Sequence, residues 1–200
     1  TYYVVVDMVP DKYEVTQKQA GAGDANSSAI DSEAEEEILP ANTEAEQSLA
    51  KSVWIKEITV SGEGVPNQNI GLKNIQGSIS IGKTLDEIYY PSSMTEEEKE
   101  GYNVTFLFRL RNTDTNEVFT ESITLDADTI RPYNGRPQVW ATFDDLDIGT
   151  YELTEVSNAQ YTISEVNSSS DNVKYNSSSG VITVPVTSGE YDFEIEVDNT

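Results

Sequence analysis

The sequence YDFEIEVDN, residues 191–199, alternates strictly between apolar and acidic side chains. A period of two predicts a β-strand with one face in the protein core and the other in water. The apolar face ends on Asn199, and an amide that is buried without a hydrogen-bond partner costs roughly 2–7 kcal/mol. We therefore expect Asn199 to find a partner in the core or to react with one. The apolar positions of this strand are Tyr191, Phe193, Ile195 and Val197.

The composition limits the classes of protein to which the chain can belong. Two hundred residues with 36% hydrophobic content can form one domain of about 120–150 residues and something smaller. With 12 basic and 36 acidic residues the net charge is −24, which argues against nucleic acid or an anionic membrane as a partner. Histidine and cysteine are absent, so the usual acid–base group at neutral pH, disulfides and thiolate chemistry are absent too. We predict no cofactor.

Targeting segments are not evident. No apolar run approaches the roughly 18 residues of a transmembrane helix, and residues 1–10 lack the basic region of a signal peptide. We expect no membrane insertion in this fragment. Because the chain opens directly on strand-like residues, we also expect it to be part of a longer protein.

Residues 1–70 are predicted to be a partial upstream β module plus an acidic linker. Strand patterns occur within residues 1–16 and 53–60. Residues 17–52 contain too few hydrophobic residues to build a core and are predicted to be a solvated loop or linker. A short helix over residues 43–51 is possible, because its residues are good helix formers.

Residues 75–200 are predicted to form an all-β sandwich, because strand patterns recur at short intervals with little competing helix. Ser93 or Thr95 can cap one helical turn whose first residues are Glu96 to Glu98. Residues 112–116 are predicted to be a hairpin turn. The predicted strands cover residues 77–85, 103–111, 117–125, 138–144, 150–156, 160–166, 173–176, 180–186 and 191–199.

Three of these strands place one polar residue in an otherwise apolar face. The residues are Lys83, Glu155 and Asn199. Each has a simple structural explanation when taken singly: a lysine can extend its amine to the rim, a glutamate can lie beyond the buried part of its strand, and an asparagine can cap a strand end. Their coincidence, with two of them on the first and last strands of the domain, favours a joint role.

An amine, a carboxylic acid and an amide that meet in a core have a specific chemistry. Burial lowers the pKa of a lysine from about 10.4 and so exposes its nucleophilic lone pair. Burial also favours the protonated form of a carboxylic acid, so Glu155 is predicted to hydrogen-bond to the Asn199 side-chain carbonyl and to shuttle protons. Attack of Lys83 on Asn199 would expel ammonia and leave an isopeptide bond. Near-attack geometry can remove roughly 7–11 kcal/mol of the barrier.

The same residues carry a resemblance to a known family. The segments GSISIGKTLDE (77–87), FDDLDIGTYELTEV (143–156) and FEIEVDNT (193–200) resemble, in order, the lysine strand, the E-box and the terminal strand of CnaB-type domains of Gram-positive pilins and surface adhesins. The resemblance implies an immunoglobulin-like/CnaB-type β-sandwich in which Lys83 and Asn199 are crosslinked with help from Glu155. After the E-box the chain departs from the family pattern, since residues 156–166 read VSNAQYTISEV.

The resemblance also implies a function. The chain would be a structural or stalk module of a pilin or adhesin, located outside the cell on the surface or cell wall of a Gram-positive bacterium. It would not be an enzyme, because the crosslink forms once. Its partners would be neighbouring pilin or adhesin subunits or domains, and possible further partners are a host protein or a glycan. No sortase sorting signal is present in these residues.

A second resemblance concerns the N-terminus. Residues 1–16 are similar to an E-box strand of an upstream domain, with Asp7 at the glutamate position. No lysine or asparagine partner can be named there. The alternative is two strands that add to the main domain or pair with a neighbouring chain.

Other functions remain open at the level of sequence. The main alternative is a carbohydrate- or protein-binding β-sandwich without a crosslink, in which Trp54, Trp140 or some tyrosines form a sugar-stacking platform. A carboxylate-based hydrolase is a weaker alternative, because Glu155 has no second inward acid beside it. Asp145 and Asp147 faintly resemble a calcium loop, but the spacing is wrong and a turn is predicted instead.

Overall fold

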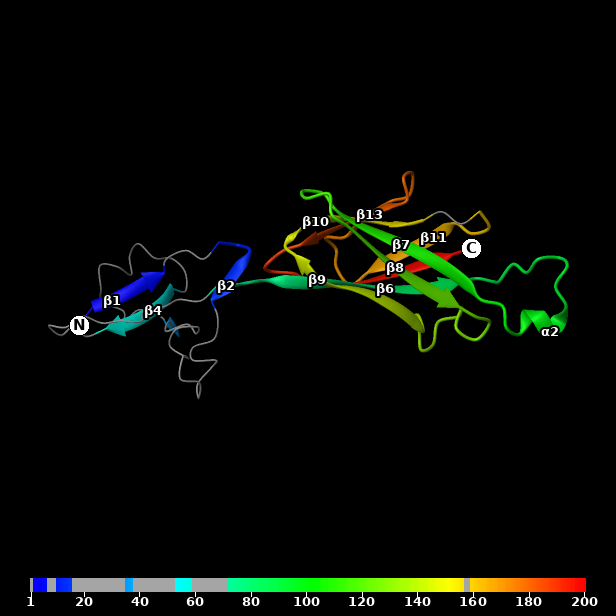
Figure 1. Cartoon of the computed structure of the whole chain (residues 1–200), viewed down its shortest axis with the longest axis horizontal. Coiled ribbons are helices and arrows are strands. Elements are labelled where there is room, and N and C mark those ends of the chain that lie inside the picture. Colours follow the sequence, from blue (N-terminus) through cyan, green and yellow to red (C-terminus); the bar gives the residue numbers. More distant parts are fainter. Residues whose placement is uncertain (1, 7–9, 16–34, 38–52, 59–71, 157–158) are drawn as a thin grey trace. The chain divides into compact units, whose positions relative to one another are not determined.

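The computed structural model describes residues 2–6, 10–15, 35–37, 53–58, 72–156 and 159–200 (Figure 1). The chain divides into two compact units, Thr1–Ile75 and Gln76–Thr200. Among the described residues, no helix is long and apolar enough to cross a membrane.

The N-terminal unit contains two small antiparallel sheets. One has the strand order β1 (Tyr2–Val6), β4 (Val53–Ile58) and β3 (Glu35–Glu37), and the other pairs β2 (Tyr13–Val15) with β5 (Leu72–Asn74). The strands predicted within residues 1–16 and 53–60 are therefore confirmed.

One prediction for this unit is wrong. The acidic run was expected to be part of a solvated loop, but Glu35–Glu37 forms a strand that pairs with residues 53–55 of β4. Edge pairing uses main-chain donors and acceptors, so a run of charged side chains does not prevent it. The possible helix over residues 43–51 and Asp7 lie outside the described residues.

The second unit is a β-sandwich, as predicted from the recurring strand patterns. One sheet has the order β12 (Lys174–Asn176), β13 (Val181–Val186), β10 (Gly149–Glu155), β7 (Val104–Asn112) and β8 (Val118–Leu125). The other has the order β11 (Ile163–Ser168), β14 (Asp192–Asn199), β6 (Gln76–Leu85) and β9 (Val139–Asp147). Observed and predicted strands differ by at most three residues at either end.

Alternate residues of the two sheets fill the core between them. On β7 the buried positions alternate with exposed ones over most of the strand, which is the pattern of a sheet with one wet face. The inward side chains are almost all apolar and fully buried. They include Ile79, Ile81, Phe106, Phe108, Leu110, Leu153, Val184, Phe193 and Ile195.

The first and last strands of the sandwich are neighbours. β14 pairs with β6 in parallel, and their Cα partners include Val197 with Lys83 and Asn199 with Leu85. All other strand pairs of the unit are antiparallel. In Figure 1, β14 ends at the C-terminus of the chain. Lys83 and Asn199 therefore lie on adjacent strands, while Glu155 comes from the opposite sheet.

The connections follow their predicted chemistry. The short helix α2 (Glu96–Lys99) begins after Thr95, whose side chain accepts a hydrogen bond from the Glu98 backbone, while the Glu98 carboxylate accepts one from the Thr95 backbone. This capping box selects Thr95 over Ser93 as the cap. At the β7–β8 hairpin the side chain of Asn112 accepts hydrogen bonds from the backbone of Asp114 and Thr115.

Gly77 allows the start of β6 to approach the chain just before β14. A Cβ atom at this position would overlap the carbonyl oxygen of Tyr191 and would lie 2.9 Å from Cγ1 of Val186. The adjacent Ser78 amide donates to the same Tyr191 oxygen at 2.9 Å. A side chain at position 77 would therefore separate the two strands where their pairing begins.

We predict that Gly77→Ala lowers the free energy of unfolding by roughly 1–3 kcal/mol, because the added methyl group has no space. Urea denaturation followed by circular dichroism measures the change. Gly189→Ala is the matched control, since a Cβ atom there meets nothing within 4 Å. Equal stabilities of the two variants would contradict the prediction.

Candidate functional site

Lys83 lies on β6 with its side chain completely buried between the sheets. Its Nζ donates to Asn199 Oδ1 at 2.7 Å, to the Val197 carbonyl at 2.9 Å and to the Thr84 carbonyl at 3.2 Å. These three acceptors match the three N–H groups of an ammonium. The amine does not extend to the rim, so that explanation of a lysine in an apolar face does not apply here.

Asn199 is also buried, and its amide lies between the other two groups. Oδ1 accepts from Lys83, and Nδ2 donates to Glu155 Oε1 at 2.6 Å. Glu155 was expected to contact the amide oxygen, but it contacts the nitrogen. The physical reason is complementarity: an ammonium can only donate and occupies the oxygen, whereas the NH₂ group needs an acceptor, which a carboxylate supplies.

Glu155 reaches the site from the end of β10 in the opposite sheet, and only 4% of its side chain is exposed. Its Oε2 atom lies 3.5 Å from Lys83 Nζ. This oxygen is buried and accepts no hydrogen bond from the residues that the structure describes. A buried acceptor without a hydrogen bond is uncommon in folded proteins and marks a place where chemistry or strain is concentrated.

The surroundings of Lys83 tune its protonation. Desolvation of the buried amine lowers the pKa of Lys83 from 10.5 to about 8, and the charges of Glu155 and, more weakly, Asp198 oppose this shift. The Phe106 ring lies below the amine, 4.6 Å from Nζ to the ring centroid. Because this pKa is lowered, a larger fraction of the Lys83 amine is neutral at pH 7 than for an exposed lysine.

This arrangement can form an amide bond. The lone pair of the neutral Lys83 amine adds to Cγ of Asn199, the Nζ–Cγ bond forms and the Cγ–Nδ2 bond breaks. Glu155 can take the proton that Nζ loses and deliver it to Nδ2, which leaves as ammonia. The carboxyl group contacts the leaving nitrogen directly, and it ends the reaction in the protonation state in which it began.

Sequence reasoning missed other groups around the amine. Phe106 belongs to the alternating apolar face of β7, and nothing in that pattern distinguishes it from the other core residues. The Val197 carbonyl follows from the parallel pairing of β6 and β14, which the sequence did not indicate. The Thr84 carbonyl belongs to the next residue of the same strand.

Trp140, a candidate for sugar stacking, is half-buried and contacts its neighbours. Its Nε1 donates to the Pro137 carbonyl at 2.9 Å, and the Arg136 guanidinium lies 5.1 Å from the ring centroid. The ring also packs over Gly82, where an added Cβ atom would lie 2.8 Å from Cζ2. The ring is therefore in contact with a guanidinium and with the β6 backbone. The side chain of Trp54 lies outside the described part of the chain.

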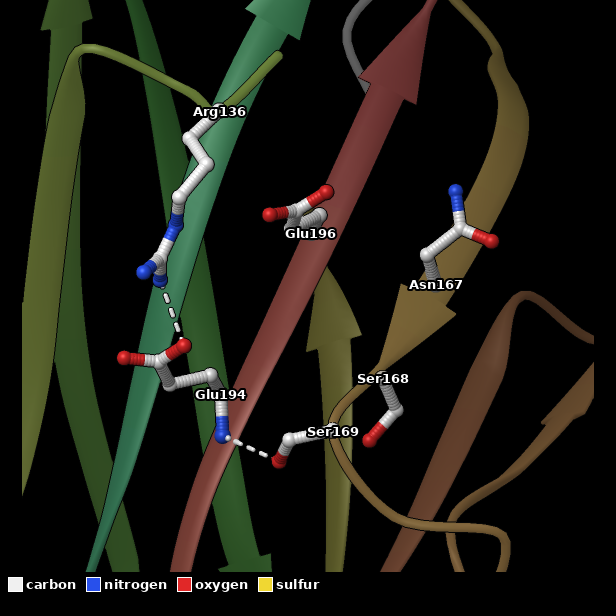
Figure 2. Close-up of a pocket in the computed structure, with 6 residues that line it drawn as sticks. All are labelled: Arg136, Asn167, Ser168, Ser169, Glu194 and Glu196. Atoms are coloured by element: carbon white, nitrogen blue, oxygen red, sulfur yellow. Dashed lines mark hydrogen bonds and ion pairs between the residues drawn. The ribbon is translucent and has the colours of Figure 1, made fainter. Parts of the chain in front are cut away.

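A polar cavity of about 240 Å³ lies on the outer face of the four-stranded sheet (Figure 2). In it the Arg136 guanidinium forms an ion pair with Glu194 at 2.5 Å, and the Glu194 backbone donates to Ser169 Oγ at 3.1 Å. None of the described residues that line it is aromatic. The lining residues are Arg136, Asn167, Ser168, Ser169, Glu194 and Glu196.

The faint calcium-loop pattern does not form a loop. Asp145 and Asp147 lie on β9, where Asp144 and Asp145 form a β-bulge opposite Ser78 and Asp145 has a φ of 56°. Within the described ranges, no three acidic residues are grouped so that they could hold a metal ion.

Comparisons with known proteins give low similarities. No protein-family profile matches the chain, and no curated protein matches it. Among solved structures, the chain is similar to a bacterial adhesin from Mobiluncus mulieris that contains intramolecular disulfide, isopeptide and ester bond cross-links. The identity is 13%, the match covers 98% of this chain and 87% of that chain, and the TM-score is 0.41. A second crystal form of that adhesin gives 12% identity and a TM-score of 0.42.

The chain is also similar to an asparagine-to-alanine variant of the major pilin from Streptococcus pyogenes. That match has 15% identity, covers 65% of this chain and 49% of that chain, and has a TM-score of 0.34. At such identities and TM-scores these similarities do not decide the function of the chain.

The lowered pKa of Lys83 predicts a pH dependence of stability. In Asn199→Ala the amide that Lys83 can attack is gone, so the amine stays free. The pKa in the fold, about 8, is below the 10.5 of the unfolded chain, so the unfolded chain binds more protons between these values. The free energy of unfolding therefore rises with pH there, by at most about 1.4 kcal/mol per pH unit.

The reference for this measurement is Asn199→Ala combined with Lys83→Met, which lacks the titrating amine. Urea denaturation from about pH 8 to about pH 9.5 stays below the titration of tyrosine near pH 10. A difference in stability between the two proteins that does not change with pH would contradict the lowered pKa.

Proposed function

We propose that this chain is a structural or stalk module of a Gram-positive surface fibre, a pilin or an adhesin, locked by an intramolecular isopeptide bond between Lys83 and Asn199. The bond would form autocatalytically with Glu155 as the proton shuttle. The observation that supports this most directly is the Asn199 amide, whose oxygen accepts from a buried lysine and whose nitrogen donates to a buried glutamate. The three sequence segments that contain these residues and resemble CnaB-type domains also support it.

The reaction is a single turnover within one chain, so the module is not an enzyme in the usual sense. Under this proposal it acts outside the cell, at the surface or cell wall. Its partners are neighbouring subunits or domains of the fibre, and a host protein or glycan where the module takes part in adhesion.

The topology gives the crosslink a mechanical purpose. β6 and β14 are parallel, so a force that pulls on the start of β6 and on the end of β14 shears the two strands against each other. The isopeptide bond joins residue 83 to residue 199 near the C-terminal ends of both strands. Tension would then pass along β6, through the bond and out of the chain, and residues 84–198 would carry none of it.

We predict that the folded protein is lighter than its sequence by one ammonia, whereas Lys83→Ala and Glu155→Ala have the full sequence mass. Intact-mass spectrometry measures this. An exposed Asn-Gly turn such as Asn134–Gly135 can also lose ammonia by cyclising, so the site of the loss must be mapped. Trypsin should release one species in which residues 74–99 are joined to residues 175–200.

The full sequence mass in well-folded wild-type protein would overturn the crosslink. It would leave a β-sandwich without a covalent lock, and a binding module would then be the better description. Circular dichroism of the two variants separates loss of the reaction from loss of the fold.

We predict that the crosslink also changes the mechanical response. In single-molecule stretching, Glu155→Ala should lengthen on unfolding by about 3.3–3.6 Å for each released residue, including residues 84–198. The wild type should not release these residues. Equal extensions for the two proteins would contradict the proposed path of the force.

The crosslink closes a loop that contains residues 84–198, and by analogy with disulfides it should also stabilise the fold by roughly 4–5 kcal/mol.

A further inference from the structure

Two hydrogen bonds of the same kind join β6 and β14 on their outer face. Ser78 Oγ donates to Asp192 Oδ1 at 2.9 Å, and Thr84 Oγ1 donates to Asp198 Oδ1. In each pair the two residues are direct Cα partners across the strands. The pairs lie six residues apart on both strands, one where the pairing begins and one beside Lys83 and Asn199.

The alignment of β6 with β14 must be fixed by contacts between the two strands themselves. β6 and β14 are the first and last strands of the unit, so no hairpin sets their alignment. On the inner face apolar side chains occupy every second position except those of Lys83 and Asn199, so a slip of two residues keeps most of the apolar alternation. Such a slip moves Asn199 by about 6.6 Å along β6 and separates its amide from the lysine amine.

The outer face penalises both slips of two residues. A slip in one direction places Asp198 opposite Asp86, where two carboxylates repel each other. A slip in the other direction places Asp198 opposite Gly82, which has no side chain to donate and is covered by Pro137 and Trp140. Ser80 cannot replace either donor without loss, because its hydroxyl already pairs with Thr142 on β9 at 2.9 Å.

We infer that the pairs Ser78–Asp192 and Thr84–Asp198 are register clamps, which position the Asn199 amide against the Lys83 amine. This inference rests on the proposed isopeptide reaction. The Thr84–Asp198 pair is the more important clamp, because its two residues directly follow Lys83 and directly precede Asn199. Its two side chains meet on the outer face of the sheet and do not touch the reacting atoms; Thr84 contacts Lys83 Nζ only through its backbone carbonyl, which a change of side chain keeps. The side chains of the pair are therefore positioning groups.

The choice of an aspartate has an electrostatic consequence. The charge of Asp198 raises the pKa of Lys83 and thereby opposes the desolvation that makes the amine reactive. The other charged group that faces Lys83 is Glu155 from the opposite sheet. Asp198 itself shares an outer cavity with Asp86, Arg131 and Glu165. Replacing the carboxylate by an amide would keep the acceptor oxygen and remove this charge.

The test follows ammonia loss over time in full-length chains made by cell-free translation and quenched in acid. Thr84→Val removes the donor while keeping the shape of the side chain, and crosslinking should slow by roughly ten- to a hundredfold. Thr84→Ser should restore the rate. Thr105→Val is the matched control, because it removes a hydroxyl that pairs with Thr124 across two strands of the other sheet at 2.8 Å.

Asp198→Asn tests the electrostatic effect, because a purely structural role of Asp198 would leave the pH–rate profile unchanged. The variant should crosslink at least as fast as the wild type at pH 7, and its pH–rate profile should shift to lower pH. If Thr84→Val weakens the fold by circular dichroism, Ser78→Ala is measured in its place and should also slow the reaction.

The outcomes separate the two proposals. If the wild type loses no ammonia, the proposed reaction fails and the positioning role fails with it. If the wild type crosslinks and Thr84→Val and Ser78→Ala both react at the rate of Thr105→Val, only the clamps are overturned. An unchanged pH profile in Asp198→Asn would overturn the electrostatic part.

Discussion

The parallel pairing of β6 with β14 is the constraint on which the rest of the structure depends. It joins the two ends of a unit whose remaining strands pair only in antiparallel fashion, and it places Lys83 and Asn199 on adjacent strands of one inner face. The opposite sheet then needs to supply only one group, Glu155 at the end of β10. A site of three side chains thus arises from strand order and alternation, without any loop specialised for chemistry.

Desolvation and the neighbouring negative charges have opposite effects on the Lys83 amine. Desolvation lowers the pKa of Lys83 and frees its lone pair, while the Glu155 and Asp198 charges hold the proton on the amine. An isolated buried ammonium would be too costly for the fold, and a fully compensated one would not react. Nζ lies 3.5 Å from Glu155 Oε2, which is longer than a hydrogen bond of normal length. At this distance the carboxylate compensates the charge of the ammonium only in part.

Much of this site could be predicted because the side chains of a strand alternate with a strict period of two. The phase of that alternation on three strands was enough to direct Lys83, Glu155 and Asn199 inward. The amide atom that faces Glu155 was predicted wrongly, since it depends on which partner occupies the oxygen. The strand at residues 35–37 was missed because it forms by pairing with the backbone of a distant segment, residues 53–55. The composition of residues 35–37 alone does not indicate that pairing.

If the proposed reaction occurs, the unreacted fold also contains a driving force for it. It holds a buried ammonium and, 3.5 Å from it, a buried carboxylate oxygen that accepts no hydrogen bond from the described residues, and taking this charged pair out of water costs free energy that the pairing must offset. Under the proposed reaction the amine becomes a neutral amide, whose single N–H group can donate to Glu155, and ammonia carries the expelled nitrogen into water. The proposed bond would therefore remove the buried ammonium from the core. Under this proposal the fold both positions the reacting groups and loses its buried ammonium when they react.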